Sequence, residues 1–264
     1  MRYNFVTEGE RLFYEYLRSQ GVSDDDIEFE KEHQGIAKRP DFSLRLNNEE
    51  CIFDVKDFEA KEIKQGYFLS ADEYGPLRAK IEEGRKQFRE FKDKCCCLVL
   101  FNQGNYDVDL TEPDIMFGAM YGDIGIVIDF DREKGEAIPS TARYGYLKDG
   151  KMVRPRTGDP QNTTISALIT LRYVPTGRLR FEHFLKSLSR SELEDPEIKA
   201  DLDADEVNLG VIVWENVDAR IPFPRELLQG DYDIRFEYDG SNLRRVFAGT
   251  IIGELVPDPF MAQE

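Results

Sequence analysis

Two short segments near the N-terminus constrain this chain most, because together they predict a pair of β-strands with charged residues at one end. Residues 39–46 read Arg-Pro-Asp-Phe-Ser-Leu-Arg-Leu, and residues 51–56 read Cys-Ile-Phe-Asp-Val-Lys after the polar turn Asn-Asn-Glu-Glu. Side chains on a strand alternate between its two faces, so Asp54 and Lys56 are expected on one face and Val55 on the other. A hairpin would then bring Asp41 close to Asp54.

Two carboxylates and one ammonium group at the end of a sheet suit a specific chemistry. Carboxylate oxygens are the hard ligands that Mg²⁺ prefers. A lysine beside a metal-bound water can help to form hydroxide, and hydroxide can attack a phosphodiester. Asp41, Asp54 and Lys56 therefore predict a site for metal-assisted hydrolysis.

The first predicted helix, residues 7–19, has both a start signal and an apolar face. Thr7 followed three residues later by Glu10 is typical of a capping box. Four apolar side chains recur at helical spacing and would share one face: Leu12, Phe13, Tyr16 and Leu17.

The dipeptide Pro40-Asp41, a gap of a dozen residues and then Asp54-Val55-Lys56 resemble the PD-(D/E)xK nuclease superfamily, whose fold is called restriction-endonuclease-like. The core of that superfamily runs helix, three antiparallel strands, helix, strand. The predicted elements follow the same order over residues 1–102: helix 7–19, strand 27–32, the two strands of the hairpin, helix 77–92 and the apolar strand 95–101.

The resemblance implies a role for each residue of the motif. Asp41 and Asp54 would bind Mg²⁺, for which Mn²⁺ is expected to substitute, and the Val55 carbonyl would be a further ligand. Lys56 would position or deprotonate the attacking water and stabilise the charge that develops on the phosphate. Glu10, on the first helix, would hold a metal-bound water or help to bind a second metal ion.

Other candidates have competing interpretations. Glu10 could be only a cap or a surface residue, with Glu8 and Glu15 as rivals for the acid on the helix. Gln87 matches the polar residue that many relatives carry on the second helix, but solvation of a helix surface explains it nearly as well. His33 could reach a phosphate from its loop, although a histidine in a polar loop is more often simply exposed.

The net charge of −17 opposes binding to nucleic acid, which usually depends on a basic surface. Binding needs only a local patch, however. Residues 78–94 hold seven basic and four acidic residues, and residues 143–156 hold five basic and one acidic. Much of the acidity lies in residues 23–32 and 189–206. We expect weak intrinsic affinity that metal, a small basic cleft or a protein partner must supplement.

The four cysteines, Cys51, Cys95, Cys96 and Cys97, do not predict a metal site, because three consecutive residues on a strand cannot all face one ion. Reduced core thiols in a cytoplasmic protein are the expectation. No apolar run is long enough to span a membrane, and the first residues lack the apolar stretch of a signal peptide. No membrane partner is therefore expected.

The second half of the chain is expected to be rich in β-structure. Strands are predicted at 123–130 and 209–214 and as a closing pair at 234–238 and 246–252, whereas residues 163–174 fit either a strand or a helix. A helix is expected at 181–190, where His183 would be structural, and the acidic segment 189–206 is expected to be a loop that could block the cleft.

Without a Gly-rich linker or a repeat, one α/β domain over residues 1–264 is expected. Residues 1–102 would form the restriction-endonuclease-like core, a mixed central sheet flanked by helices. Residues 103–264 would be a β-rich C-terminal elaboration of that domain.

The resemblance implies a Mg²⁺-dependent nuclease, with a DNA endonuclease of restriction or defence as the leading expectation. A catalytically silent or partner-activated binding subunit on the same fold is the alternative, and a homodimer is compatible with both. A glycosidase that uses paired carboxylates is less favoured, because nothing in the sequence fixes their separation.

Overall fold

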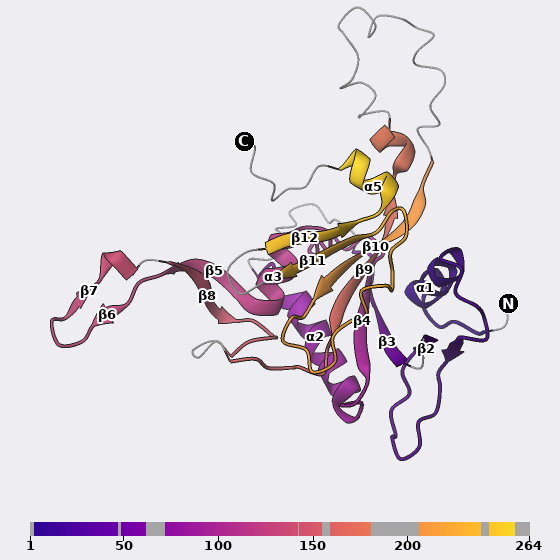
Figure 1. The fold of residues 1–264 in the computed structure, drawn as a ribbon, viewed down its shortest axis with the longest axis horizontal. Coiled ribbons are helices and arrows are strands. Elements are labelled where there is room, and N and C mark those ends of the chain that lie inside the picture. The colour runs from indigo at the N-terminus through magenta and orange to yellow at the C-terminus, as the bar shows by residue number, and fades with distance from the viewer. Residues whose placement is uncertain are drawn as a thin grey trace, which may run out of the picture.

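A mixed β-sheet runs through both halves of the chain in the computed structural model (Figure 1). The structure describes residues 3–46, 49–61, 72–141, 143–154, 159–180, 206–238 and 243–256. Within these residues the sheet has eight strands, which follow one another across the sheet from one edge to the other: β1 (Ile27–Phe29), β2 (Phe42–Leu46), β3 (Glu49–Phe58), β4 (Cys95–Asn102), β9 (Ala167–Val174), β10 (Asn208–Glu215), β11 (Ile234–Tyr238) and β12 (Leu243–Ala248). The expected α/β class with a mixed sheet is confirmed.

The strand directions divide the sheet into three parts. Strand β2 is antiparallel to both of its neighbours, β1 and β3. Strands β3, β4 and β9 are parallel, so their carboxyl ends lie at the same edge of the sheet. Strand β10 is antiparallel to β9 and parallel to β11, and β12 closes the sheet antiparallel to β11.

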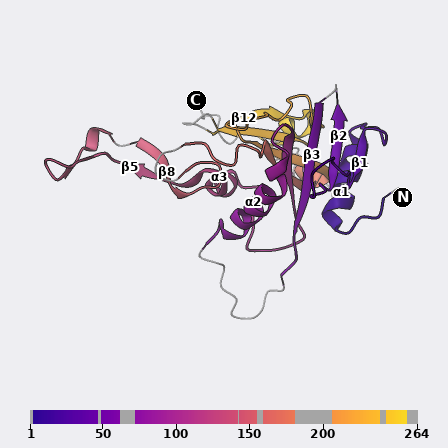
Figure 2. The ribbon, with the colours of Figure 1, turned by 90° about the horizontal axis from the view of Figure 1, so that it is seen from below.

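Helices cover both faces of the sheet. Helix α1 (Glu8–Ser19) packs on one face, and α2 (Gly75–Gln87) and α3 (Pro113–Tyr121) pack on the other, as Figure 2 shows for α1 and α2. The predicted capping box of α1 is confirmed by reciprocal bonds between Thr7 and Glu10. The helix predicted at 77–92 begins earlier, at Gly75, and its last turn is the 3₁₀ helix η1 (Phe88–Glu90).

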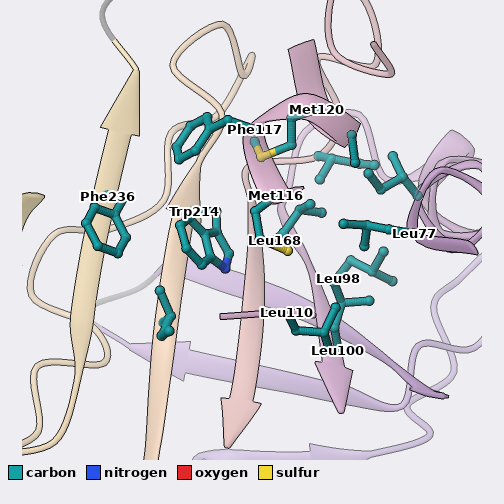
Figure 3. Close-up of a cluster of buried hydrophobic side chains, with 14 of the residues drawn as sticks. Leu77, Leu98, Leu100, Leu110, Met116, Phe117, Met120, Leu168, Trp214 and Phe236 are labelled. Atoms are coloured by element: carbon teal, nitrogen blue, oxygen red, sulfur yellow. The ribbon is translucent and has the colours of Figure 1, made fainter. Parts of the chain in front are cut away.

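The core on the α2 and α3 face spans both halves of the chain (Figure 3). Leu98 on β4 and Leu168 on β9 are fully buried there beside Leu77 of α2. Trp214 on β10 packs edge-on against Phe117 of α3, with 5.6 Å between ring centroids. Buried contacts of this kind fix the position of the second half relative to the first, because core packing is dense and specific.

A two-stranded ribbon extends away from the sheet (Figures 1 and 2). It consists of β5 (Gly122–Val127) and β8 (Arg143–Asp149), followed outward by the short pair β6 (Phe130–Asp131) and β7 (Glu136–Ala137) and the 3₁₀ helix η2 (Pro139–Thr141). The prediction of a buried strand at 123–130 is wrong at its end, because Phe130 is 60% exposed. No described element covers this part of the ribbon.

Other boundaries differ for local reasons. The strand predicted at 27–32 ends at Phe29 because Glu30 has a positive φ of 48°, which a strand does not allow. The ambiguous segment 163–174 is a strand from Ala167 onward. The strand predicted at 246–252 is wrong beyond Ala248, because Gly249 caps the short helix α5 (Thr250–Leu255).

Several predictions fall outside the described residues. They are the helix at 181–190 with His183 and the acidic segment up to residue 205. Among the helices that the structure does describe, none is long and apolar enough to cross a membrane.

Candidate active site

Strand β3 presents Asp54 and Lys56 on the same face, as strand alternation predicts. Their neighbours of the same parity, Ile52 and Phe58, belong to the core on the α2 side, whereas Val55 packs on the α1 side. Asp54 is only 2% exposed, and the Lys56 Nζ atom lies 2.7 Å from its Oδ2. The acid and the ammonium group therefore form a largely buried ion pair.

Asp41 joins this pair from the neighbouring strand. It directly precedes β2, and the register that pairs Phe42 with Phe53 sets Asp41 opposite Asp54. The Val55 amide donates a hydrogen bond to Asp41 Oδ2 at 2.6 Å. The structure thus brings together the two aspartates and the lysine that the sequence singled out.

The charges of the site act on one another. Burial, and next the charge of Asp54, raise the pKa of Asp41 to about 7, against the opposing effects of the Val55 amide and Lys56. Burial alone would lower the pKa of Lys56, but Asp54, Asp41 and Glu83 outweigh it and raise that pKa above its usual value. In the metal-free protein, Lys56 is therefore charged, and Asp41 is protonated more readily than an ordinary aspartate.

Glu10 lies at the third position of α1 and is 7% exposed. Its Oε2 atom accepts hydrogen bonds from the amides of Val6 at 2.7 Å and Thr7 at 3.3 Å, so the cap interpretation is confirmed. Its charge also contributes to the raised pKa of Asp41, which places it within electrostatic range of the site. A role toward metal stays a prediction.

The rival acids on α1 have surface partners instead. Arg11 forms ion pairs with Glu8, at 2.5 Å, and with Glu15. Both acids thus have a partner on the helix surface, and the main charges that act on Asp41 and Lys56 come from other residues.

Asp57 is a polar residue of β3 that the sequence analysis missed. It points to the α1 side, where its Oδ2 accepts the Gly9 amide at 3.0 Å and a bond from Gln103. Its Oδ1 accepts the Thr7 hydroxyl at 3.4 Å. Asp57 therefore joins the N-terminus of α1 to β3. The sequence signal that could have revealed it is that Asp57 shares the strand face of Val55, on which the capped helix was expected to pack.

Gln87 and His33 lie beside the carboxylates rather than among them. The Gln87 amide donates to the Arg39 carbonyl at 2.8 Å, two residues before Asp41, so it connects α2 to the chain that enters β2. His33 lies 3.4 Å from Ser43 and packs edge-on against Phe91, and burial lowers its pKa. Gln87 and His33 therefore support the chain around the site.

The donor set fits a hard divalent cation. The Asp54 Oδ2 atom is fully buried, and although Lys56 is near, no donor meets it with hydrogen-bond geometry in the described part of the chain. The Val55 carbonyl lies on the same edge of β3 as the Val55 amide. This edge faces Asp41, which precedes the first residue of β2. Two carboxylates and a carbonyl suit Mg²⁺, which keeps several waters. Among the described side chains, no three of His, Cys, Asp or Glu are grouped to hold a metal.

The four cysteines are buried thiols that form no disulfide, as predicted. Cys96 points to the α2 side, whereas Cys51, Cys95 and Cys97 share the α1 side, with 3.8 Å between the Sγ atoms of Cys95 and Cys97. The alternation confirms that the consecutive cysteines do not face one ion.

No protein-family model, curated protein or solved structure matches this chain. What the site does is therefore inferred from its own residues and geometry.

Proposed function

We propose that the protein is a metal-dependent nuclease with a restriction-endonuclease-like core, and that DNA is its substrate. The observation that carries the proposal is the convergence of Asp54 and Lys56 on one face of β3 with Asp41 opposite them. The order of α1, three antiparallel strands, α2 and a strand parallel to β3 supports it, because the PD-(D/E)xK core has the same order.

Each residue has a distinct task in this proposal. Asp41, Asp54 and the Val55 carbonyl would hold Mg²⁺, which supplies an activated water and polarises the phosphate. Lys56 is charged before metal binds, so it would orient the water and stabilise negative charge on the phosphate rather than act as a base. Glu10 would hold a water at the edge of the site, since its charge acts on Asp41 more weakly than the charges of Asp54 and Lys56 do.

The supporting contacts would keep these groups in place. Gln87 fixes the chain just before Asp41, and Asp57 fixes the start of α1 that carries Glu10. A site held by such bonds loses little entropy when substrate binds, which favours in-line attack at phosphorus.

A catalytically silent or partner-activated subunit on the same fold is the second candidate. The net charge of −17 favours it, because strong unaided binding to nucleic acid needs a larger basic surface. The complete set of Asp41, Asp54 and Lys56 disfavours it, since a silent member has no need to keep a buried charged set.

Cleavage assays test the proposal directly. Plasmid, linear duplex, single-stranded DNA and RNA would be incubated with Mg²⁺ or Mn²⁺ and the wild-type chain, Asp54→Ala or Lys56→Ala. We expect metal-dependent cutting that falls by a factor on the order of 100 or more in both variants. Lys86→Ala, an exposed lysine of α2, is the matched control and should cut normally.

Two results would count against the proposal. Undiminished cutting by folded Lys56→Ala would refute the role of that lysine. Absence of cutting of every substrate by the folded wild-type chain would favour the silent or partner-activated subunit.

A further inference from the structure

A second feature lies at the same edge of the sheet, where β4 and β9 end. A hollow of about 410 Å³ is lined by the ends of these strands and by the loop after β4, including Asn102, Tyr106, Thr170, Arg172 and Tyr173. Its volume is within the range of small-ligand sites. The proposed mechanism of cleavage makes no use of it.

The strand register relates this hollow to the candidate active site. Lys56 on β3 pairs with Leu100 on β4, which pairs with Thr170 on β9. Two strand spacings, about 10 Å, therefore separate Lys56 from Thr170 along the row. Arg172 follows Thr170 by two residues, so it lies on the same face as Lys56 and nearer the edge. One chain of a few nucleotides could contact both places.

Arg172 carries a largely buried guanidinium group. Its Nε and Nη2 atoms are buried, and neither makes a hydrogen bond within the described part of the chain. Burial lowers its pKa to about 10, opposed only by the charge of Asp233. The Asp233 carboxylate is itself bound by the Tyr16 hydroxyl and by the amides of Val211 and Gly230.

An unpaired buried charge is costly, by several kcal/mol in typical cases. Arg235, whose Nε also lacks a hydrogen bond, is nevertheless paired with Glu215 at 3.1 Å and with the Leu227 carbonyl at 2.6 Å. The planar guanidinium group of arginine is suited to phosphate, which it can bind through two parallel hydrogen bonds. Arg172 lines the hollow, so an anion there would offset a charge that lacks hydrogen bonds at two buried nitrogens.

Two exposed aromatic rings line the same hollow. Tyr106 is 64% exposed and Tyr173 is 50% exposed, and the Tyr173 ring rests edge-on against Phe101 at 6.2 Å. Exposed aromatic rings next to a cation are typical of sites that bind single-stranded nucleic acid, because bases stack on the rings and the backbone phosphates pair with the cation. Duplex DNA hides its base faces and would not use these rings.

We infer that the hollow binds one nucleotide of a single-stranded segment of the substrate, with its phosphate on Arg172 and its base on Tyr106 or Tyr173. The inference rests on the proposed nuclease function and names its substrate class. Asp109 also lines the hollow, but it is exposed, so solvent screens its repulsion of an anion.

Binding without metal tests the inference separately from cleavage. The wild-type chain in EDTA would be titrated into a fluorescent single strand of about 12 nucleotides, a length within the usual site sizes, and into the matching duplex, with anisotropy as the readout. We expect the single strand to bind more tightly. Arg172→Met should weaken that binding about tenfold or more, and so should Tyr106→Ala combined with Tyr173→Ala, given the usual contribution of base stacking. Arg89→Met, an exposed arginine of η1, is the matched control.

Thermal unfolding distinguishes a ligand-binding arginine from a structural one. If Arg172 lacks its partner in the free protein, Arg172→Met should melt at the same or a higher temperature without ligand. The same variant should lose the stabilisation that a deoxynucleoside monophosphate gives the wild-type chain. A lower melting temperature of Arg172→Met without ligand would mean that the cation serves the fold, and it would overturn the inference.

The outcomes also separate the inference from the nuclease proposal. Normal cutting and normal single-strand affinity in Arg172→Met would overturn the inference alone. Binding that depends on Arg172, in a protein that cuts nothing, would overturn the nuclease proposal alone. The assignment to a single-stranded substrate would be overturned if Arg172→Met weakened binding of the duplex and of the single strand equally. Binding of the mononucleotide without binding of the oligonucleotide would also overturn it.

Discussion

Asp57 Oδ2 accepts the backbone N–H of Gly9 at 3.0 Å, and this bond holds the N-terminus of α1 against the end of β3. The carboxylate serves as a cap from a distant strand, where negative charge is favourable. Glu10 follows Gly9 directly, so the same contact sets where Glu10 lies relative to Asp41. The approach of strand and helix is close enough to leave no room for a side chain at position 9.

We predict that Gly9→Ala destabilises the protein. A Cβ atom at this position would lie 2.1 Å from Asp57 Oδ1 and 3.0 Å from Val55 Cγ1. Overpacking of this kind typically costs about 1–3 kcal/mol, which reverses the usual gain from replacing a helical glycine by alanine. Urea denaturation would measure the change in the free energy of unfolding.

Gly253→Ala in α5 is the matched control, because a Cβ atom there would meet its nearest neighbour at 3.4 Å. It should be neutral or stabilising. Adding Asp57→Ala to Gly9→Ala should recover part of the loss by removing the clash. Wild-type stability of Gly9→Ala would mean that α1 and β3 are not held at this distance.

Metal-free protein should become less stable as pH rises from about 4 to about 7. The pKa of Asp41 is about 7 in the folded chain, against an ordinary value of 3.8, so ionisation is less favourable in the folded state than in the unfolded one. The stability that the neutral acid contributes is complete below the ordinary pKa and is lost as pH rises through the folded pKa. Each pKa unit corresponds to about 1.4 kcal/mol.

Denaturation in EDTA at about pH 5 and about pH 8 would measure this loss. Asp41→Asn should remove much of it, because an amide keeps the acceptor for the Val55 amide and carries no charge. Asp109→Asn, an exposed acid, should leave the pH dependence unchanged. The same pH dependence in Asp41→Asn and wild type would show that Asp41 is not the titrating group.

Mn²⁺ or Mg²⁺ should raise the melting temperature by several degrees at saturating concentration, since a ligand at about 100 times its Kd adds about 2.7 kcal/mol. Asp54→Ala should abolish the rise, because it removes the buried oxygen that has no hydrogen-bond donor among the described residues. Glu83→Gln is the control, as this acid influences Lys56 but is not in the donor set. An equal rise in Asp54→Ala would place the bound metal elsewhere.

The cysteine thiols should react with Ellman's reagent only when the protein unfolds. All four are buried in the described structure, on strands β3 and β4 at the centre of the sheet. Labelling of the native protein should therefore be slow, and denaturant should release four thiols. Ser19→Cys on the exposed end of α1 gives a fast positive control. Rapid reaction of a native thiol would reveal local opening of the central strands.

The sequence by itself determined the local elements of the first hundred residues. The capping box, the apolar face of α1 and the apolar strand at Cys95 follow from signals between residues a few positions apart, which a single sequence contains in full. Alternation along β3 likewise placed Asp54 and Lys56 on one face, and alternation along β4 set Cys96 apart from its neighbours.

Only the tertiary structure decided what lies next to these elements. Pairing of β9 with β4 joins residues about seventy positions apart, and no local pattern specifies such a partner. The same pairing places Arg172 and two tyrosines at the edge that also carries Lys56. Asp57 likewise caps α1 only because the fold places the start of α1 beside the end of β3. Burial, an absent charge partner and a distant cap are properties of chains packed together, so the order of residues alone does not contain them.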